Sequence, residues 1–390
     1  MSDRLRHILS LDDFERAARS RLPGPIFAYV SGAAETDASF RDNRAAFAEW
    51  GFVPRILVDV SKRTTAATLL GREWKAPFGI APMGITALSA YRGDLVLARA
   101  AAAAGIPFAL SASSLIRMED VVRENPEAWF QAYLPGNLER IGPLIDRVAA
   151  AGFETLVVTV DVAVLPSREN NVRAGFSTPL RPSLRLAWQG VTHPRWAVGT
   201  WWRTILAHGM PHFENSFAER GAPIVSRTVE RDFTQRDHLN WTHLEQIRAR
   251  WKGKLVLKGI VSVEDARRAD ETGVDAIIVS NHGGRQLDGT VSPLRVLPQI
   301  VAAVRGMPVM VDGGFRRGTD VIKAFALGAA FAWIGRPFNF AAAVAGEEGV
   351  AHAAALLRGE IDRDMALLGV TSLAQVGPQH LMRMGGMHGR

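Results

Sequence analysis

The chain has 390 residues, of which 47% are hydrophobic and 22% are charged. This is the composition of a globular protein with enough apolar material for a sizeable core, which excludes wholesale disorder. Cysteine is absent, so disulfides, zinc–thiolate sites and a cysteine nucleophile are excluded, and no metal site is expected. Residues 1–20 mix charged and apolar side chains and do not resemble a secretory signal. A cytoplasmic location is therefore expected.

The charge is unevenly distributed along the chain. The formal net charge is +7 and the isoelectric point is about 10.2, a balance that suggests nucleic acid or an anionic membrane as a partner. Residues 170–213 contain five arginines, no acidic residue and four of the ten tryptophans. They carry most of the excess, so the rest of the chain is nearly neutral. A nucleic-acid groove needs basic residues spread over a wider surface, and nucleic acid is not expected as a partner.

Short apolar runs rich in β-forming residues alternate with helical stretches. The predicted strands lie at 77–82, 106–111, 128–133, 155–161, 254–259, 276–282, 308–313 and 331–335, and predicted helices lie at 94–104, 138–151, 264–272, 294–304 and 319–327. Eight alternating units with unsplit apolar strands predict an α/β fold, a (β/α)₈ TIM barrel. A doubly wound sheet is the alternative. No uninterrupted apolar run is long enough to predict a spanning helix.

The chain, 1–390, is predicted to form a single domain. Residues 1–76 precede the barrel as an N-terminal cap, and 77–169 with 241–369 form the barrel. Residues 170–240 interrupt it after the fourth strand as an inserted lid or membrane segment, and 370–390 form a tail. A long insertion of this kind is more often functional than a plain connector.

Polar residues and glycines gather at the ends of the predicted strands, where barrels of this kind hold their active sites. In strand order they are Pro82, Met83 and Gly84; Ser111; Gln131 and Tyr133; Thr159 and Asp161; Lys258; Ser280, Asn281, His282, Gly283, Gly284 and Arg285; Asp312, Gly313, Gly314 and Arg316; and Gly335 and Arg336. A capping or core role explains any one of them. Their joint placement predicts a site.

The loops after the seventh and eighth strands predict a phosphate site. Gly313 and Gly314 lead with Arg316 into a helix, and Arg336 follows Gly335 after the next strand. Backbone N–H groups and two guanidinium groups would converge where barrels commonly hold a phosphate. Glycine turns with solvated arginines are the alternative.

The sixth strand supplies a candidate base. Asp161, at the end of the fourth strand, could orient the His282 imidazole and stabilise it once protonated. Arg168 and Arg285 could form a carboxylate clamp. The ammonium of Lys258 follows apolar residues, where it needs an anion or an electron-rich ligand, and a buried ion pair is the alternative.

Four segments resemble the FMN-dependent L-2-hydroxy acid dehydrogenase and oxidase family. They are SNHGGRQLDG (280–289), VDGGFRRGTDVIKAFALGA (311–329), WFQAY (129–133) and the stretch from TVDVAV (159–164) to Arg168. The similarity runs from about residue 11 to residue 369. It implies an FMN cofactor and the oxidation of a small L-2-hydroxy acid to the 2-oxo acid, with FMN as electron acceptor.

The resemblance also implies residue roles. It makes His282 the base and Asp161 its partner, Arg168 and Arg285 the carboxylate ligands, and Tyr29 and Tyr133 substrate contacts. It assigns FMN contacts to Pro82, Met83, Gly84, Ser111, Gln131, Thr159, Lys258, Ser280, Asp312, Gly314, Arg316, Gly335 and Arg336. His282 would take either the Cα proton, leaving a carbanion, or the hydroxyl proton during hydride transfer. Both routes need a neutral imidazole.

A few positions predict the size of the substrate and whether the enzyme is a dehydrogenase or an oxidase. Gly84 resembles the dehydrogenase pattern, whereas oxidases of the family often have alanine. Ser113 stands where glycolate oxidase-like members have a bulky tryptophan. Together with Leu165 and Met83, it predicts a wide apolar pocket that favours substrates from lactate to mandelate over glycolate. An oxidase that reduces oxygen to H₂O₂ is the same-fold alternative. A non-redox barrel that binds a phosphate ligand is the alternative from another class.

The resemblance also gives residues 170–213 an expected role. In membrane-associated bacterial members the corresponding insertion attaches the enzyme to the bilayer, where a quinone collects the electrons. Tryptophan and arginine without acids suit such an interface. Peripheral contact with the inner face of the cell membrane, a quinone acceptor and a homotetramer are therefore expected. A mobile lid whose aromatic residues pack on the barrel is the alternative for this segment.

Overall fold

The computed structural model describes residues 5–229 and 233–384. Residues 1–4, 230–232 and 385–390 lie outside the described part of the chain. The extreme ends of the expected cap and tail and three residues of the expected insertion therefore have no structural account.

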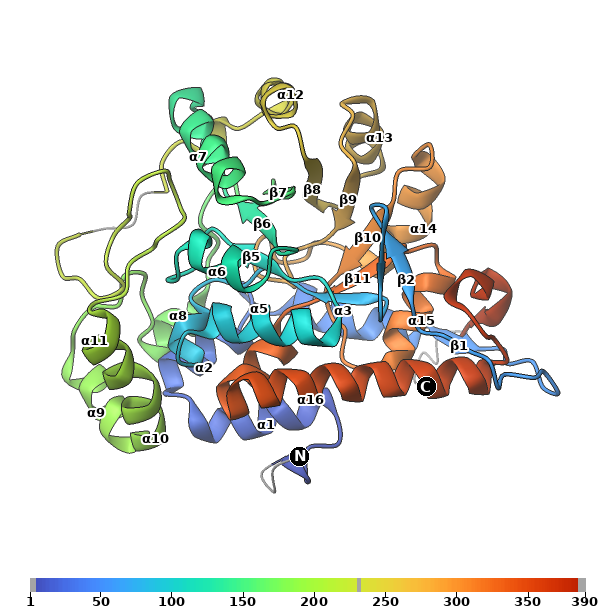
Figure 1. The fold of residues 1–390 in the computed structure, drawn as a ribbon, viewed down its shortest axis with the longest axis horizontal. Helices are drawn as coiled ribbons and strands as arrows, with labels where there is room; N and C mark the ends of the chain where they lie inside the picture. Colours follow the sequence, from blue (N-terminus) through green and yellow to red (C-terminus); the bar gives the residue numbers. More distant parts are fainter. Residues whose placement is uncertain (1–4, 230–232, 385–390) are drawn as a thin grey trace.

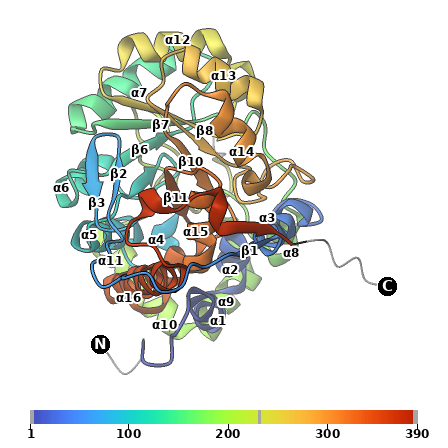
Figure 2. The ribbon, with the colours of Figure 1, turned by 90° about the vertical axis from the view of Figure 1, so that its right-hand side faces the viewer.

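Eight parallel strands form one sheet around a common axis (Figures 1 and 2). They are β4 (Phe78–Ile80), β5 (Ala109–Ser111), β6 (Trp129–Ala132), β7 (Thr155–Thr159), β8 (Lys254–Ile260), β9 (Ala276–Val279), β10 (Val309–Asp312) and β11 (Phe331–Ile334). Their order is β4-β11-β10-β9-β8-β7-β6-β5, and a parallel bridge between Ile80 and Phe108 joins the two ends. The predicted TIM barrel is confirmed: seven of the eight predicted strands contain the observed one, and β8 extends one residue beyond its predicted end.

Helices follow the strands and cover the outside of the barrel. They are α4 (Thr86–Ser89), α5 (Gly93–Ala104), α6 (Met118–Glu124), α7 (Leu138–Ala151), α12 (Trp241–Arg250), α13 (Val263–Glu271), α14 (Pro293–Ala303), α15 (Gly318–Ala326) and α16 (Arg336–Leu368). The five helices predicted in detail agree to within one residue at each end. Local signals explain this accuracy: the Asn137 side chain caps α7 at its start, and Gly152 ends it in the left-handed conformation.

The N-terminal part contains helices α1 (Leu11–Arg21), α2 (Gly24–Ser31) and α3 (Ala38–Ala48). Strand β1 (Trp50–Phe52) pairs with β12 (Leu381–Arg383), so the segment that follows α3 lies beside the last strand of the chain. Strands β2 (Ala67–Leu69) and β3 (Arg72–Trp74) form a hairpin. Leu69 and Trp74 of this hairpin pack into the interior of the barrel, where they close one end of it.

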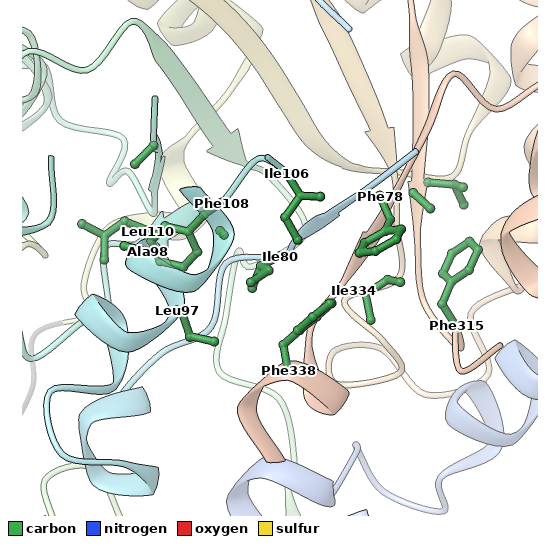
Figure 3. Packing of buried hydrophobic residues seen from close by; sticks show 14 of the residues in the cluster. Phe78, Ile80, Leu97, Ala98, Ile106, Phe108, Leu110, Phe315, Ile334 and Phe338 are labelled. Carbon is green, nitrogen blue, oxygen red and sulfur yellow. The ribbon is translucent and has the colours of Figure 1, made fainter. Parts of the chain in front are cut away.

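Side-chain alternation along the strands creates two apolar layers. Outward residues such as Phe78, Ile80, Phe108 and Ile334 pack against the helices (Figure 3). Inward residues fill the barrel: Ala109, Trp129, Val157, Val256, Ile278, Met310 and Trp333. Since the strand period is two, the next inward positions toward the carboxyl ends are Ser111, Gln131, Thr159, Lys258, Ser280, Asp312 and Gly335. A polar layer thus lies directly above the apolar interior.

Helix α16 has the length and composition of a membrane-crossing helix, the only such helix in the described ranges. Half of its most apolar window is buried, and it packs along α1 and α5. Its backbone departs from helical geometry at Ala345 and Gly346. These contacts are those of a helix that packs in the protein core.

The insertion after β7 forms a small group of helices at one side of the barrel (Figure 1). It contains α8 (Glu169–Ala174), α9 (Leu184–Thr192), α10 (Pro194–Trp196), a π-helical turn over Ala197–Trp202 and α11 (Arg203–His208). Trp196 is buried and its indole N–H donates to the carbonyl of Leu88 at 2.6 Å. Trp201 stacks on Trp196. The inner face of the insertion is therefore fixed to the barrel by these two indoles.

Candidate active site

A cavity of about 210 Å³ lies at the carboxyl end of the barrel. Among the predicted site residues, those that line it are Tyr29, Pro82, Met83, Gly84, Tyr133, Thr159, Arg168, Lys258, His282, Arg285, Asp312, Gly314, Arg316, Gly335 and Arg336. Four others lie just behind the wall. Asp161 and Ser280 bond directly to lining residues, whereas the Ser111 hydroxyl donates to Gln131 in the polar layer at 3.1 Å.

His282 and Asp161 form a close pair at the base of the cavity. The imidazole Nδ1 lies 3.0 Å from Oδ1 of Asp161, while Nε2 lies 3.4 Å from the Tyr133 hydroxyl. His282 has a left-handed backbone with φ of 57°, and Gly283 and Gly284 continue it with φ of 65° and 76°. This turn brings the imidazole over the strand end, and the backbone N–H of His282 donates to Ser280.

The protonation states of this pair follow from its surroundings. Burial lowers the pKa of His282, Asp161 partly offsets that effect, and the charges of Lys258 and Arg168 lower it again, so its pKa falls below the ordinary 6.5. Burial alone would raise the pKa of Asp161, but His282 and Lys258 outweigh burial and its pKa is lowered. A neutral imidazole therefore donates its Nδ1 proton to a carboxylate and presents an unprotonated Nε2.

Arg168 and Arg285 line the cavity together. Arg285 donates to the carbonyl of Gly32 at 2.7 Å, and its guanidinium lies 5.0 Å from the centre of the Tyr29 ring. Arg168 donates to the backbone carbonyl of Arg285 and to Gln286. Burial first, and then the charge of Arg168, lower the pKa of Arg285 to about 10. Two partly buried like charges are unfavourable alone, and a carboxylate bound between them would relieve the repulsion.

The two arginines expected at a phosphate site differ in their partners. Arg316 lies 3.3 Å from a carboxylate oxygen of Asp12 and 3.5 Å from one of Glu15, both on α1. Arg336 donates instead to the carbonyls of Val30, Gly32 and Gly283. Burial, followed by the charges of Arg285 and Arg316, lowers the pKa of Arg336 well below its ordinary value. Because α2 ends at Ser31, carbonyls at its C-terminal end hold the guanidinium of Arg336 in place.

Glycine is required where the loop after β10 meets the cap. Gly314 has φ of +83°, and a Cβ at this position would lie 2.4 Å from the carbonyl oxygen of Asn43. A side chain would therefore force the cap and the loop apart. The expected glycine turn is present beside Arg316, and both line the cavity.

Lys258 forms a buried ion pair, the alternative to a ligand contact that the sequence left open, and it also lines the cavity. Its ammonium lies 2.8 Å from Asp312 and donates to Ser280 at 2.8 Å. Burial opposes the charge, but Asp312 and Asp161 outweigh it and raise its pKa. The group is therefore a fixed positive charge in the wall.

Among the buried polar atoms of the polar layer, Nε2 of Gln131 and Oγ1 of Thr159 have no hydrogen-bond partner among the described residues. Such atoms cost free energy unless a ligand completes them. A planar ring with polar edge atoms fits these two groups and Lys258, and a phosphate fits Arg316, Arg336 and the glycine loop. The residues present thus match the two halves of FMN.

Phe233, Arg236 and Trp333 are among the cavity residues that the sequence did not suggest. The guanidinium of Arg236 lies 4.9 Å from the centre of the Tyr133 ring and at the same distance from that of Phe233. Both residues come from the insertion, which has no regular pattern there. Trp333 could have been found, because it lies two residues before Gly335 on the inward face of β11.

The predicted wide pocket is also part of this cavity, since Met83, Gly84, Ser113 and Leu165 all line it. A Cβ on Gly84 would lie 2.9 Å from Cβ of Ser113 and 3.1 Å from the Tyr29 hydroxyl. Leu165 is 60% exposed, so it lies at the entrance. Gly84 and Ser113 are small residues in the wall of the cavity that His282 also lines.

The family model for FMN-dependent dehydrogenases matches residues 18–383. The chain is 38% identical to (S)-mandelate dehydrogenase of Pseudomonas putida over 387 residues, covering 97% of this chain and 95% of the relative. It is 38% identical to L-lactate dehydrogenase of Alcaligenes faecalis over 389 residues, covering 96% of this chain and 99% of the relative.

Solved structures show the same similarity. A crystal structure of the monotopic membrane protein (S)-mandelate dehydrogenase matches with a TM-score of 0.88 and 36% identity, over 97% of this chain and 100% of that one. A mandelate oxidase variant with (S)-mandelic acid matches with a TM-score of 0.80 and 36% identity, over 97% and 99%. The family match decides against a non-redox ligand-binding barrel. The chain belongs to the FMN-dependent dehydrogenase family, and it is an FMN-dependent 2-hydroxy acid dehydrogenase of the mandelate and lactate type.

Proposed function

We propose that the protein oxidises an L-2-hydroxy acid with an apolar side chain to the 2-oxo acid and passes the electrons to a membrane quinone. The observation that carries the chemical part is the neutral imidazole of His282, bonded to Asp161 at 3.0 Å and opening into a cavity lined by Arg168 and Arg285. Bound FMN supplies the two-electron acceptor for the reaction.

The residues of the chain divide the work as follows. Arg168 and Arg285 bind the substrate carboxylate and so fix its orientation. His282 takes up a proton at Nε2, and Asp161 stabilises the imidazolium that results. Tyr133, 3.4 Å from Nε2, contacts the substrate hydroxyl, while Tyr29 contacts the carboxylate. Whether the proton comes from Cα or from the hydroxyl is open, and both routes use this geometry.

The FMN ligands are part of the same proposal. We assign the ring to the polar layer and to the β4 loop: Pro82, Met83, Gly84, Ser111, Gln131, Thr159, Lys258 and Ser280. We assign the phosphate to Gly314, Arg316, Gly335 and Arg336, with Asp312 fixing Lys258 through their ion pair. Lys258 would hold negative charge that develops on the reduced ring.

The outer face of the insertion supports membrane attachment. Leu184, Trp188 and Val191 lie at i, i+4 and i+7 on α9, and Val198, Trp202 and Leu206 lie at i, i+4 and i+8 on the π turn and α11. All six are more than half exposed. We call these six residues the apolar stripe. Large exposed apolar patches mark interaction sites, and α9 and α11 are too short to span a bilayer. We propose that the stripe lies in the cytoplasmic leaflet of the cell membrane.

Two of the four tryptophans therefore face outward and two pack on the barrel. The outward pair supports membrane contact, whereas the inward pair packs on the barrel, as the alternative for this segment expected. We also propose the homotetramer common in the family, which light scattering on the detergent-solubilised protein would measure.

Rapid mixing identifies the electron acceptor. The FMN-loaded protein, reduced by substrate without oxygen, is mixed with a soluble quinone analogue or with oxygen. Fast reoxidation by the quinone and slow reoxidation by oxygen are expected. Fast reoxidation by oxygen would support the second candidate function, a mandelate-type oxidase. The similarity to mandelate oxidase structures is the observation that favours this candidate.

A further inference from the structure

A cluster of basic side chains lies beside the apolar stripe, outside the active site. Tyr91 and Arg92, just before α5, meet Arg203 and His208 of α11. The Tyr91 hydroxyl lies 2.9 Å from Nε2 of His208, and Nη1 of Arg92 lies 3.1 Å from the same nitrogen. The guanidinium of Arg203 lies 3.9 Å from the centre of the Tyr91 ring. We call these four residues the basic cluster.

The cluster has more positive charge than its neighbours balance. The nearest carboxylate, Asp120 on α6, lies 3.6 Å from Arg92, and both side chains are partly exposed at 31% and 25%. Arg203 and His208 are exposed. Burial first, then Arg92 and Arg203, lower the pKa of His208, with Asp120 acting in the opposite direction. The local field therefore favours an anion.

The position of the cluster indicates what kind of anion it meets. Arg203 directly follows Trp202, and His208 lies two residues after Leu206, so both belong to the helix that carries part of the stripe. In an interfacial helix the apolar face lies at the acyl boundary, and the flanking cations reach the headgroups. Two guanidinium groups together match the oxygens of a phosphodiester better than a single ammonium does.

We infer that Tyr91, Arg92, Arg203 and His208 form a headgroup site for an anionic phospholipid, which selects the membrane that the stripe enters. This inference rests on the proposed membrane attachment and adds a defined site to it. If the attraction were diffuse, the loss of membrane binding would depend only on how many cations are removed from the insertion. With a specific headgroup site, the loss depends on which cation is removed.

Flotation of the FMN-loaded full chain on vesicles tests the site. Vesicles of phosphatidylcholine alone are compared with vesicles of phosphatidylcholine and phosphatidylglycerol. Arg203→Gln and Arg92→Gln, on two separate elements, are each expected to weaken binding to the mixed vesicles at least about tenfold, with little change on phosphatidylcholine alone. Similar losses of vesicle binding in both variants would indicate that Arg203 on α11 and Arg92 before α5 contact the same headgroup.

The matched control is Arg195→Gln, which removes the same charge from α10 in the same insertion. It is expected to weaken binding about fivefold or less, the size of one general surface charge. Dye-linked oxidation of a soluble substrate is expected to stay unchanged in all three variants, which shows that each one folds.

The contradicting outcomes are distinct. Equal losses for Arg203→Gln and Arg195→Gln would overturn the headgroup site and leave the attachment standing. A wild-type chain that floats with neither vesicle would overturn the attachment and the site with it. A change in oligomeric state of Arg203→Gln without lipid, measured by sedimentation, would also overturn the site, because the cluster would then bind a second copy of the chain.

Discussion

Nδ1 of His282 lies 3.0 Å from Asp161, while Nε2 of the same ring lies 3.4 Å from the Tyr133 hydroxyl. One nitrogen is thus committed to a buried carboxylate, and the other opens into the cavity. This division explains how a single histidine can be neutral at rest and still accept a proton from the substrate, because Asp161 stabilises its charged form.

His282→Ala is expected to retain FMN and lose the chemical step. General-base catalysis typically contributes on the order of a hundredfold to ten-thousandfold, so kcat should fall by that amount. The yellow spectrum of the purified variant serves as the control for cofactor binding. Turnover at the wild-type rate by a yellow His282→Ala variant would place the base elsewhere.

The acid limb of the pH profile is expected below the ordinary pKa of histidine. The reaction needs neutral His282, whose pKa is lowered from 6.5, so kcat/KM should fall only as the pH drops through that lower value. Asp161 raises the pKa of His282. Asp161→Asn should therefore move the acid limb to still lower pH and also reduce kcat, because the imidazolium loses its partner. An acid limb that moves upward in Asp161→Asn would contradict this assignment.

Arg285→Lys is expected to weaken substrate binding. An ammonium cannot make the paired hydrogen bonds of a guanidinium, and charged hydrogen bonds of this kind contribute roughly 1.5–3 kcal/mol, which corresponds to a KM higher by about tenfold to a hundredfold. Steady-state assays with a dye acceptor measure it. Arg305→Lys, at an exposed position in the loop before β10 and outside the cavity lining, is the matched control and should leave KM unchanged.

Ser113→Trp is expected to reverse the preference for large substrates. Ser113 lines the cavity beside Gly84, so an indole at this position would fill part of the cavity. Since a mismatch of even one methylene changes specificity by about tenfold or more, kcat/KM for (S)-mandelate should fall at least about tenfold relative to L-lactate. A parallel decrease for both substrates would show that the side chain lies elsewhere.

The apolar stripe is expected to hold the protein on membranes. Burying a side chain the size of leucine contributes about 1.5–3 kcal/mol, so Trp202→Ser combined with Leu206→Ser should lower vesicle binding at least about a hundredfold. Leu367→Ser, at a residue that is 76% exposed on α16, is the control. If the control releases the protein equally well, the stripe is not the attachment surface.

The sequence predicted the barrel well because each strand and helix carries its own local signal. Unsplit apolar strands and capped helices such as α7 need no distant contact to be recognised. The strand-end rule also brought His282, Lys258 and Arg336 to one place. The pairing of Arg316 with Asp12 and Glu15 was missed, since it joins α1 to a loop about three hundred residues later.

The sequence also did not predict the contact of Arg236 with Tyr133 or which side of the insertion faces the barrel, and the reason is different. Arg236 lies in an irregular segment, so no periodicity indicates that its guanidinium packs over Tyr133. Composition identified residues 170–213 as unusual, but it could not separate Trp196, which donates to Leu88, from Trp202, which is 54% exposed. Only the path of the chain decides which indole faces the barrel.

Anaerobic bleaching of the FMN-loaded protein tests the central assignment most directly. The absorbance of the flavin is followed while 2-hydroxy acids are added in turn. The acids are glycolate, L-lactate, (S)-mandelate and long-chain L-2-hydroxy acids, with the D-enantiomers of the chiral acids. Rapid bleaching by (S)-mandelate or L-lactate is expected, without bleaching by the D-enantiomers or in His282→Ala. Absence of bleaching by every L-2-hydroxy acid, or equal bleaching of the His282→Ala variant, would contradict the assigned site.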